Sequence, residues 1–219
     1  MAFGRVIYAV ANNVLLHYPQ RRQILTPDPI KRYTVSFHST LSRHQQMVDS
    51  LFAMTPQLEA LSNRINECVL AGNKVLFFGN GGSAADAQHM AAEFIVRYKD
   101  DRQPLAAIAL TTDTSILTAH SNDYSFDSVF DRQILALGKP GDIAIGLSTS
   151  GNSKNVINGV KAAQSLGIYS VAFTGDSGGQ LLEIADECVR IQSTETARVQ
   201  EGHIIIGHWL CEALDAQLA

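Results

Sequence analysis

A glycine-rich turn is followed by two side chains that can bind a metal ion or move protons. Residues 77 to 94 read FFGNGGSAADAQHMAAEF and include His89 and Glu93. Each residue of a helix advances by about 100°, so these two side chains are offset by about 40° and project from one face. An imidazole and a carboxylate in that relation can hold a divalent ion or act as acid and base. Such a pair alone is weak evidence, and its position after a glycine-rich loop strengthens it.

A second pair, Gln200 and His208, lies near the end of the chain. Eight residues separate them, which on a helix is an offset of about 80° across two turns. If the two helices pack together or meet across subunits, two imidazoles, a carboxylate and an amide oxygen form a site suited to zinc or a similar divalent ion. Four other histidines are expected to be packed or surface residues without a ligand role: His17, His38, His44 and His203.

Two loops are candidates for binding a phosphate, and each follows a predicted strand and precedes a predicted helix. The first is GNGGS, residues 79–83, whose glycines permit close approach of a ligand to the backbone. It matches neither of the common nucleotide-binding patterns. The second is STSGNS, residues 148–153, with hydroxyls on Ser148, Thr149, Ser150 and Ser153. Hydroxyls beside the free N–H groups of a helix start form an anion site, most simply for a phosphate monoester, whereas a single serine there could merely cap the helix.

From Lys74 onward, short apolar runs alternate with helical patterns, which is typical of successive βα units around a parallel sheet. The runs lack apolar–polar alternation, so helices must cover both faces of the sheet. Strands are predicted at 74–79, 105–110, 142–148, 169–175 and 187–192. Helices are predicted at 83–98, 153–166 and, with less defined ends, about 113–120, 126–137, 179–185 and 197–218. The sequence thus predicts an α/β fold with a five-stranded parallel sheet.

A long helix is predicted ahead of the sheet, over residues 37–71, with an interruption near Pro56. It ends at Ala71-Gly72-Asn73, a helix-terminating signal. Residues 1–34 fit the βα pattern least well and are assigned to an N-terminal extension, and residues 35–219 to one domain.

Composition limits the class of protein. The chain has 219 residues, 46% hydrophobic and 17% charged, which suits one globular core. A net charge of −4 gives no electrostatic signature of binding to nucleic acid or to an anionic membrane. No apolar run approaches the roughly 20 residues of a membrane span, and the N-terminus lacks a convincing cleavage site, so a cytoplasmic location is expected.

Together, the motifs GNGGSAADAQH, STSGNS and TARVQEGHIIIGH resemble the sugar isomerase (SIS) domain, and more narrowly the bacterial phosphoheptose isomerase family. The resemblance extends over about residues 40–218. It implies a flavodoxin-like three-layer sandwich. It also implies interconversion of sedoheptulose 7-phosphate and glycero-manno-heptose 7-phosphate through an enediolate, the first step of nucleotide-heptose biosynthesis. This family forms homotetramers with active sites built between subunits.

The resemblance assigns roles to individual positions. It implies that Glu93 and His208 carry protons. It implies a zinc ion, one per subunit, with the ligands His89, Glu93, Gln200 and His208. Substrate contacts are implied for Asn80, Gly81, Gly82, Ser83, Glu93, Asn122, Asp123, Ser148, Thr149, Ser150, Ser153 and Gln200.

A few positions need comment. Some members of the family carry Asp and others Ala at the position of Ala197. Gly202 and Gly207 are poor helix formers inside the last helix, and they are expected to permit close helix packing.

Two other readings are compatible with the sequence. One is a non-enzymatic SIS protein that binds the bacterial replication initiator, a relative that lacks the full acid–base set. The other is an SIS isomerase of a different phosphosugar, such as an arabinose or hexulose phosphate. The presence of Glu93 and His208 favours the phosphoheptose isomerase.

Overall fold

The computed structural model describes residues 36–218, which form one compact unit from Phe37 onward. The predicted extension over residues 1–34 lies outside the described residues. Five parallel strands form a single sheet in the order β2-β1-β3-β4-β5. The strands are β1 (Val75–Gly79), β2 (Ala107–Ala109), β3 (Ile143–Ser148), β4 (Tyr169–Thr174) and β5 (Glu187–Arg190).

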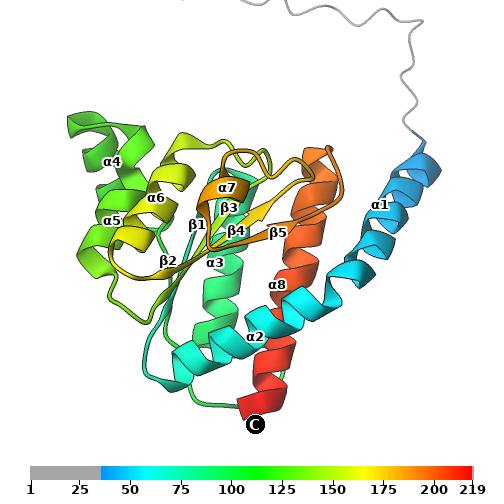
Figure 1. Ribbon diagram of the computed structural model, residues 1–219, viewed down its shortest axis with the longest axis horizontal. Helices are drawn as coiled ribbons and strands as arrows, with labels where there is room; N and C mark the ends of the chain where they lie inside the picture. Colours follow the sequence, from blue (N-terminus) through cyan, green and yellow to red (C-terminus); the bar gives the residue numbers. More distant parts are fainter. Residues whose placement is uncertain (1–35, 219) are drawn as a thin grey trace, which may run out of the picture. The chain divides into compact units, whose positions relative to one another are not determined.

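Helices cover both faces of the sheet, as Figure 1 shows. Successive residues of β1 alternate between two buried clusters, with Val75 and Phe77 in one and Leu76 and Phe78 in the other. The first cluster includes residues of α1 (Phe37–Leu51), α2 (Thr55–Leu70), α3 (Gly82–Ile95) and α8 (Thr196–Leu218). The second includes residues of α5 (Val129–Leu137), α6 (Lys154–Ser165) and α7 (Leu181–Ile184). The predicted three-layer α/β sandwich is therefore confirmed.

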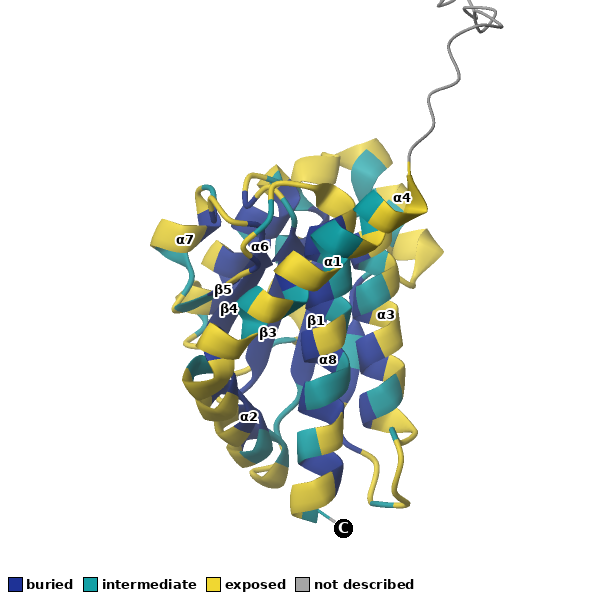
Figure 2. Ribbon diagram, turned by 90° about the vertical axis from the view of Figure 1, so that its right-hand side faces the viewer, coloured by how far each residue is buried: buried dark blue, intermediate teal, exposed yellow. Residues whose placement is uncertain are grey.

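The remaining helices are short or exposed. A 3-10 turn, η1 (Phe52–Met54), separates α1 from α2, and a second one, η2 (Phe126–Ser128), precedes α5. Helix α4 (Thr114–Asp123) buries none of its residues, in agreement with its exposed surface in Figure 2. None of the helices within residues 36–218 combines the length and the apolar character of a membrane span.

The predicted interruption of the long N-terminal helix is confirmed. The chain changes to the 3-10 turn just before Pro56, which occupies the first turn of α2. Proline has no N–H to donate, and the first turn of a helix needs none. At the other end Gly72 takes a φ of 76° after α2, as the terminating signal indicates.

Helix α3 is shorter than predicted. The prediction continued to residue 98, whereas α3 ends at Ile95. The carbonyls of Glu93 and Phe94 instead accept hydrogen bonds from Arg102, and that of Phe94 also accepts one from the Leu105 N–H. The chain therefore leaves the helix early because residues further along supply these donors.

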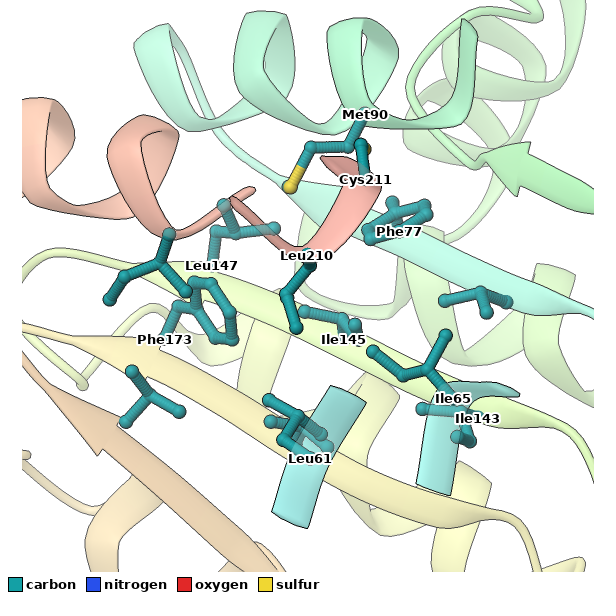
Figure 3. Packing of buried hydrophobic residues seen from close by; sticks show 14 of the residues in the cluster. Leu61, Ile65, Phe77, Met90, Ile143, Ile145, Leu147, Phe173, Leu210 and Cys211 are labelled. Carbon is teal, nitrogen blue, oxygen red and sulfur yellow. The ribbon is translucent and has the colours of Figure 1, made fainter. Parts of the chain in front are cut away.

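Helices α3 and α8 pack closely against each other over the sheet. A Cβ added at Gly207 of α8 would lie 2.7 Å from the Met90 Sδ of α3, so a larger residue there would require the Met90 side chain to move. Figure 3 shows Met90 and Cys211 together above Phe77, with Leu210 directed toward the strands. The expectation that Gly207 permits close packing is confirmed, and so is that for Gly202, where an added Cβ would meet the Ile191 side chain.

His203 of α8 is fully buried, as one of the expected packed histidines. Its Nε2 donates to the Thr174 carbonyl at 3.2 Å, while its Nδ1 has no partner among the described residues. Burial lowers the pKa of His203 to about 4, although the hydrogen bond to Thr174 opposes the shift. The imidazole is therefore neutral in the folded protein near neutral pH.

This burial predicts a loss of stability in mild acid. The folded pKa lies below the ordinary value of about 6.5, so the unfolded chain binds the proton first as pH falls. The contribution of neutral His203 to stability is complete above pH 6.5 and is lost as pH falls from about 6.5 to 4. At pH 4.5 the free energy of unfolding should be lower by roughly 2 kcal/mol. Urea unfolding at pH 7 and pH 4.5 measures it. The non-titrating H203Q variant should lose less stability between the two values, and H38Q, at an exposed site, should behave as the unsubstituted protein. Equal pH dependence in all three proteins would contradict the prediction.

Candidate active site

The two glycine- and serine-containing loops meet where the strand order reverses. Strands β1 and β3 are neighbours in the sheet, and the chain leaves β1 for α3 on one face but leaves β3 for α6 on the other. In open α/β sheets, ligands bind in the crevice that forms outside the carboxyl ends of such strands. The fold thus places GNGGS and STSGNS on the two sides of one crevice.

The GNGGS loop is shaped for close backbone approach. Gly81 adopts φ 58° and ψ −120°, and α3 begins at the next residue. Ser83 is buried in the first turn of this helix. Asn80 forms a reciprocal pair of amide hydrogen bonds with Asn155 of α6, at 2.8 and 2.9 Å. This pair fixes the GNGGS loop to the start of the helix that follows STSGNS.

The STSGNS loop collects hydroxyls at the end of β3. The Ser148 Oγ lies 2.9 Å from the Ser153 Oγ, and Ser148 is almost fully buried. Ser153 occupies the N-cap position of α6, yet its side chain makes no capping hydrogen bond. The alternative reading, that Ser153 merely caps the helix, is therefore not what the structure shows. Thr149 is half-buried and Ser150 exposed, and the backbone N–H groups of the first turn of α6 begin beside them.

The STSGNS loop is packed against a second glycine-rich segment, residues 175–181. Gly151 takes a φ of 67°, and a Cβ added there would overlap with the carbonyl oxygen of Gly178. The Gly175 N–H donates to the Thr149 carbonyl at 3.0 Å, and the Leu181 N–H donates to the Gly151 carbonyl at 3.1 Å. The loop is therefore held in place by backbone contacts that leave no room for a side chain.

Three of the predicted acid–base and metal residues converge between α3 and α8. The Nε2 atoms of His89 and His208 lie 3.4 Å apart, and their rings meet edge to face with centroids 4.9 Å apart. The Glu93 Oε1 lies 3.2 Å from the His89 Nε2. Tyr98 stacks on the His208 ring with centroids 5.6 Å apart. The sequence left open whether the two helices pack together or meet across subunits, and the structure shows them packed within one chain. The Glu93 side chain is largely shielded, at 23% exposed.

Gln200 lies two turns before His208 on α8, and its side chain packs directly against Gly82. A Cβ at Gly82 would overlap with the amide group of Gln200. Gln200 thus joins the last helix to the GNGGS loop, which places its amide near the predicted substrate side.

Asn122 and Asp123 lie at the end of α4 and are exposed. The Asn122 Nδ2 donates to the Asp123 Oδ1 at 2.8 Å. No hydrogen bond within residues 36–218 joins this pair to the two loops or to the imidazoles, so its substrate role stays a prediction.

The sequence reading missed two polar residues next to the site. Asn155 carries the amide pair that links the two loops, and an Asn two residues after the start of a predicted helix gives no signal of that role. Asp86 lies on α3 three residues before His89, and its Oδ2 is buried without a partner among the described residues. Burial raises the pKa of the Asp86 carboxyl above its ordinary value, and nearby His89 opposes the shift.

The donor set near His89 fits a metal ion in its chemistry and in two of its pairwise distances. Two ligands bound at about 2.0–2.1 Å to one tetrahedral ion lie about 3.4 Å apart. The His89–His208 separation of 3.4 Å and the His89–Glu93 separation of 3.2 Å agree with this value. Within residues 36–218, no three His, Cys, Asp or Glu side chains are already arranged around a single point. The zinc assignment therefore stays a prediction.

Comparison with known proteins agrees with this arrangement. The SIS domain family model matches residues 40–175. The phosphoheptose isomerase of Aquifex aeolicus is 60% identical over 144 residues, which are 66% of this chain and 75% of that protein. The structure of phosphoheptose isomerase from Neisseria gonorrhoeae superposes with a TM-score of 0.77 at 40% identity, covering 82% of this chain and 96% of that one. That from Francisella tularensis has a TM-score of 0.79 at 35% identity over the same shares. This chain belongs to the phosphoheptose isomerase family of SIS-domain proteins.

Proposed function

We propose that the protein is an aldose–ketose isomerase that converts D-sedoheptulose 7-phosphate to D-glycero-D-manno-heptose 7-phosphate, the first step toward nucleotide-activated heptose. The observation that carries the proposal is the cluster of Glu93, His89 and His208 between α3 and α8. Helix α3 begins in the GNGGS loop, and Gln200, near the start of α8, packs against Gly82 of that loop. The names of the relatives support the seven-carbon substrate.

The reaction moves a carbonyl from C2 to C1, which requires one carbon-bound proton to leave and another to return. Glu93 removes the proton from C1, and the electron pair of that bond forms the C1=C2 double bond of an enediol. His208 donates a proton to the developing oxyanion at O2. In the second half the hydroxyl at O1 loses its proton to His208, and Glu93 returns a proton to C2. The Glu93 carboxylate and the protonated His208 imidazole are thus regenerated with each turnover.

The phosphate is held away from the reacting carbons. The hydroxyls of Ser148, Thr149, Ser150 and Ser153, with the N–H groups that begin α6, suit a phosphate dianion without a cationic side chain. Asn80, Gly81, Gly82 and Ser83 of the other loop are the proposed further substrate contacts, and Gln200 packs on Gly82. Binding of the phosphate orients C1 and C2 beside the reacting side chains, so its binding energy lowers the activation barrier of proton transfer.

The direct test is turnover of sedoheptulose 7-phosphate to its aldose by the full chain, followed by chromatography or NMR. The aldose is the expected product. An inactive protein with added zinc would favour the non-catalytic SIS reading, and conversion of an arabinose or hexulose phosphate instead would favour the other-phosphosugar reading.

We further propose one zinc ion per subunit, held by His89, Glu93, Gln200 and His208. A bound divalent cation would stabilise the negative charge that develops on the substrate oxygens. Gln200 is the ligand least supported by distance, because its amide contacts Gly82.

Metal analysis after dialysis tests the zinc proposal independently of activity. We expect about one zinc per chain in the unsubstituted protein and loss of the bound ion in H89Q and H208N, because each removes a nitrogen donor. The H38Q variant, at an exposed site, serves as the matched histidine control and should keep its zinc. A zinc-free protein that isomerises the substrate at full rate after chelator treatment would overturn the proposal.

We propose a homotetramer in which other copies cover an apolar groove. The groove, of about 300 Å³, lies between α8 and the junction of α1 and α2, and its lining includes Leu51, Phe52, Ile205 and Trp209. Phe52 is 76% exposed and lines this groove together with other apolar side chains, and contiguous exposed apolar patches mark interaction sites. Mass photometry should show four subunits, and F52D should shift the distribution to smaller species.

We propose a cytoplasmic location because the three cysteines are free thiols. Cys68, Cys188 and Cys211 form no disulfide, which suits a reducing compartment.

A further inference from the structure

A buried ion pair joins the segment that follows α3 to the end of α8. The Arg102 Nε donates to the Asp215 Oδ1 at 2.6 Å, and each side chain is only 1% exposed. Charged side chains are almost never fully buried unless they are paired and hydrogen-bonded. Such a pair is weak evidence for stability by itself, so its hydrogen-bond partners indicate what it does.

Arg102 is bonded directly to the backbone of the proposed base. Its Nη2 donates to the Glu93 carbonyl at 2.9 Å, and its Nη1 donates to the Phe94 carbonyl at 2.9 Å. Both carbonyls belong to the last turn of α3, where the helix supplies no N–H partners and the negative end of the helix dipole lies. The guanidinium therefore acts as a C-terminal cap at the residue that carries the base.

Asp215 completes the connection from the side of α8. Its Oδ2 accepts hydrogen bonds from the backbone N–H groups of Lys99 and Asp100, at 2.7 and 3.1 Å. Asp215 follows His208 by seven residues, an offset of about 20°, so both side chains leave α8 on nearly the same face. Helix α8, which carries His208, is thus linked by hydrogen bonds through Asp215 and Arg102 to the backbone of Glu93.

We infer that the Arg102–Asp215 pair is a positioning device that sets the distance between Glu93 and His208. This inference rests on the proposed isomerase function. Glu93 is only two residues from the end of α3, where a helix frays unless it is capped, so its carboxylate direction depends on this cap. The phosphate loops lie at the opposite end of α3 and need no contact with the pair.

The kinetic consequence is a loss in the proton-transfer step without a loss in substrate binding. For R102Q we expect kcat to fall on the order of tenfold, because hydrogen-bond partners that orient a functional side chain commonly have effects of that size. We expect KM for sedoheptulose 7-phosphate to stay within about threefold. The primary isotope effect on kcat, measured with substrate deuterated at C1, should rise because proton transfer becomes slower relative to other steps.

A matched control and a second variant make the test independent of folding. E212Q removes the exposed Lys99–Glu212 ion pair, which joins the same segment to the same helix, and should leave kcat and the isotope effect unchanged. Removing Arg102 alone leaves a buried carboxylate unpaired, whereas the double variant R102M/D215L removes both charges and is better tolerated in buried sites. The double variant should show the same fall in kcat and the same larger isotope effect.

The outcomes separate the two proposals. No turnover by the unsubstituted protein would overturn the proposed function. An active unsubstituted protein, with R102Q or R102M/D215L folded and unchanged in kcat and in the isotope effect, would overturn the positioning role alone. A loss of activity that follows only the folded fraction measured by circular dichroism, with an unchanged isotope effect, would also overturn it.

Discussion

Replacing Glu93 with glutamine is expected to lower kcat for sedoheptulose 7-phosphate on the order of 1000-fold. Glutamine keeps the size and hydrogen-bonding shape of the side chain but cannot accept the proton from C1. A positioned general base commonly contributes 100- to 10,000-fold, and here one carboxylate serves both proton transfers of the cycle. The expected KM is little changed, because the phosphate is held by the STSGNS loop.

Proton exchange with solvent provides the second measurement. In D2O the unsubstituted protein should introduce deuterium at C2 of the aldose, because the proton on the Glu93 carboxyl exchanges before it is returned. E93Q should lose exchange to the same extent as turnover, while the zinc content reports separately whether a ligand was lost. The control E67Q, at an exposed carboxylate of α2, should match the unsubstituted protein. Full exchange activity in E93Q would show that another group is the base.

The fold follows closely from the sequence because its signals are local. Each of the five apolar runs became a strand, and each strand is one to three residues shorter than predicted because the flanking chain turns away from the sheet. Continuous apolar character correctly indicated burial on both faces, since β1 feeds two separate clusters. The hydroxyls of STSGNS and the four-residue spacing of His89 and Glu93 are also local, and both indicated where to look for the site.

The parts of the site that the sequence did not indicate are contacts between distant residues. Asn80 and Asn155 are 75 positions apart, and Arg102 and Asp215 are 113 apart. Each contact depends on the strand order and on the close approach of α3 and α8, which no short pattern encodes. The early end of α3 has the same origin, because its last carbonyls are bonded by residues that return from further along the chain. Long-range packing thus decides which polar groups support the reacting ones.

Gly151 is the position at which the STSGNS loop is most sensitive to the addition of a single methyl group. The loop and the Gly178 backbone are in contact, and a Cβ at Gly151 would overlap with the Gly178 carbonyl and also lie 2.8 Å from the Gly179 N. Backbone atoms cannot rotate aside as a flexible side chain can, so the STSGNS loop itself must move. G151A is therefore expected to raise KM on the order of 100-fold, since a displacement of about 1 Å in a positioned site has an effect of that size.

A second glycine isolates the cause of this effect. Gly72 has a similar positive φ of 76°, but a Cβ there would meet no atom within 4 Å. G72A thus carries the backbone strain of a left-handed alanine, about 1 kcal/mol, without the collision. Denaturant unfolding should show about this strain cost for G72A and a larger loss of stability for G151A, and only G151A should weaken inhibition by inorganic phosphate and raise KM. If G151A keeps its KM and its affinity for phosphate, the phosphate is not bound at STSGNS, and Ser148 and Ser153 pair for a structural reason alone.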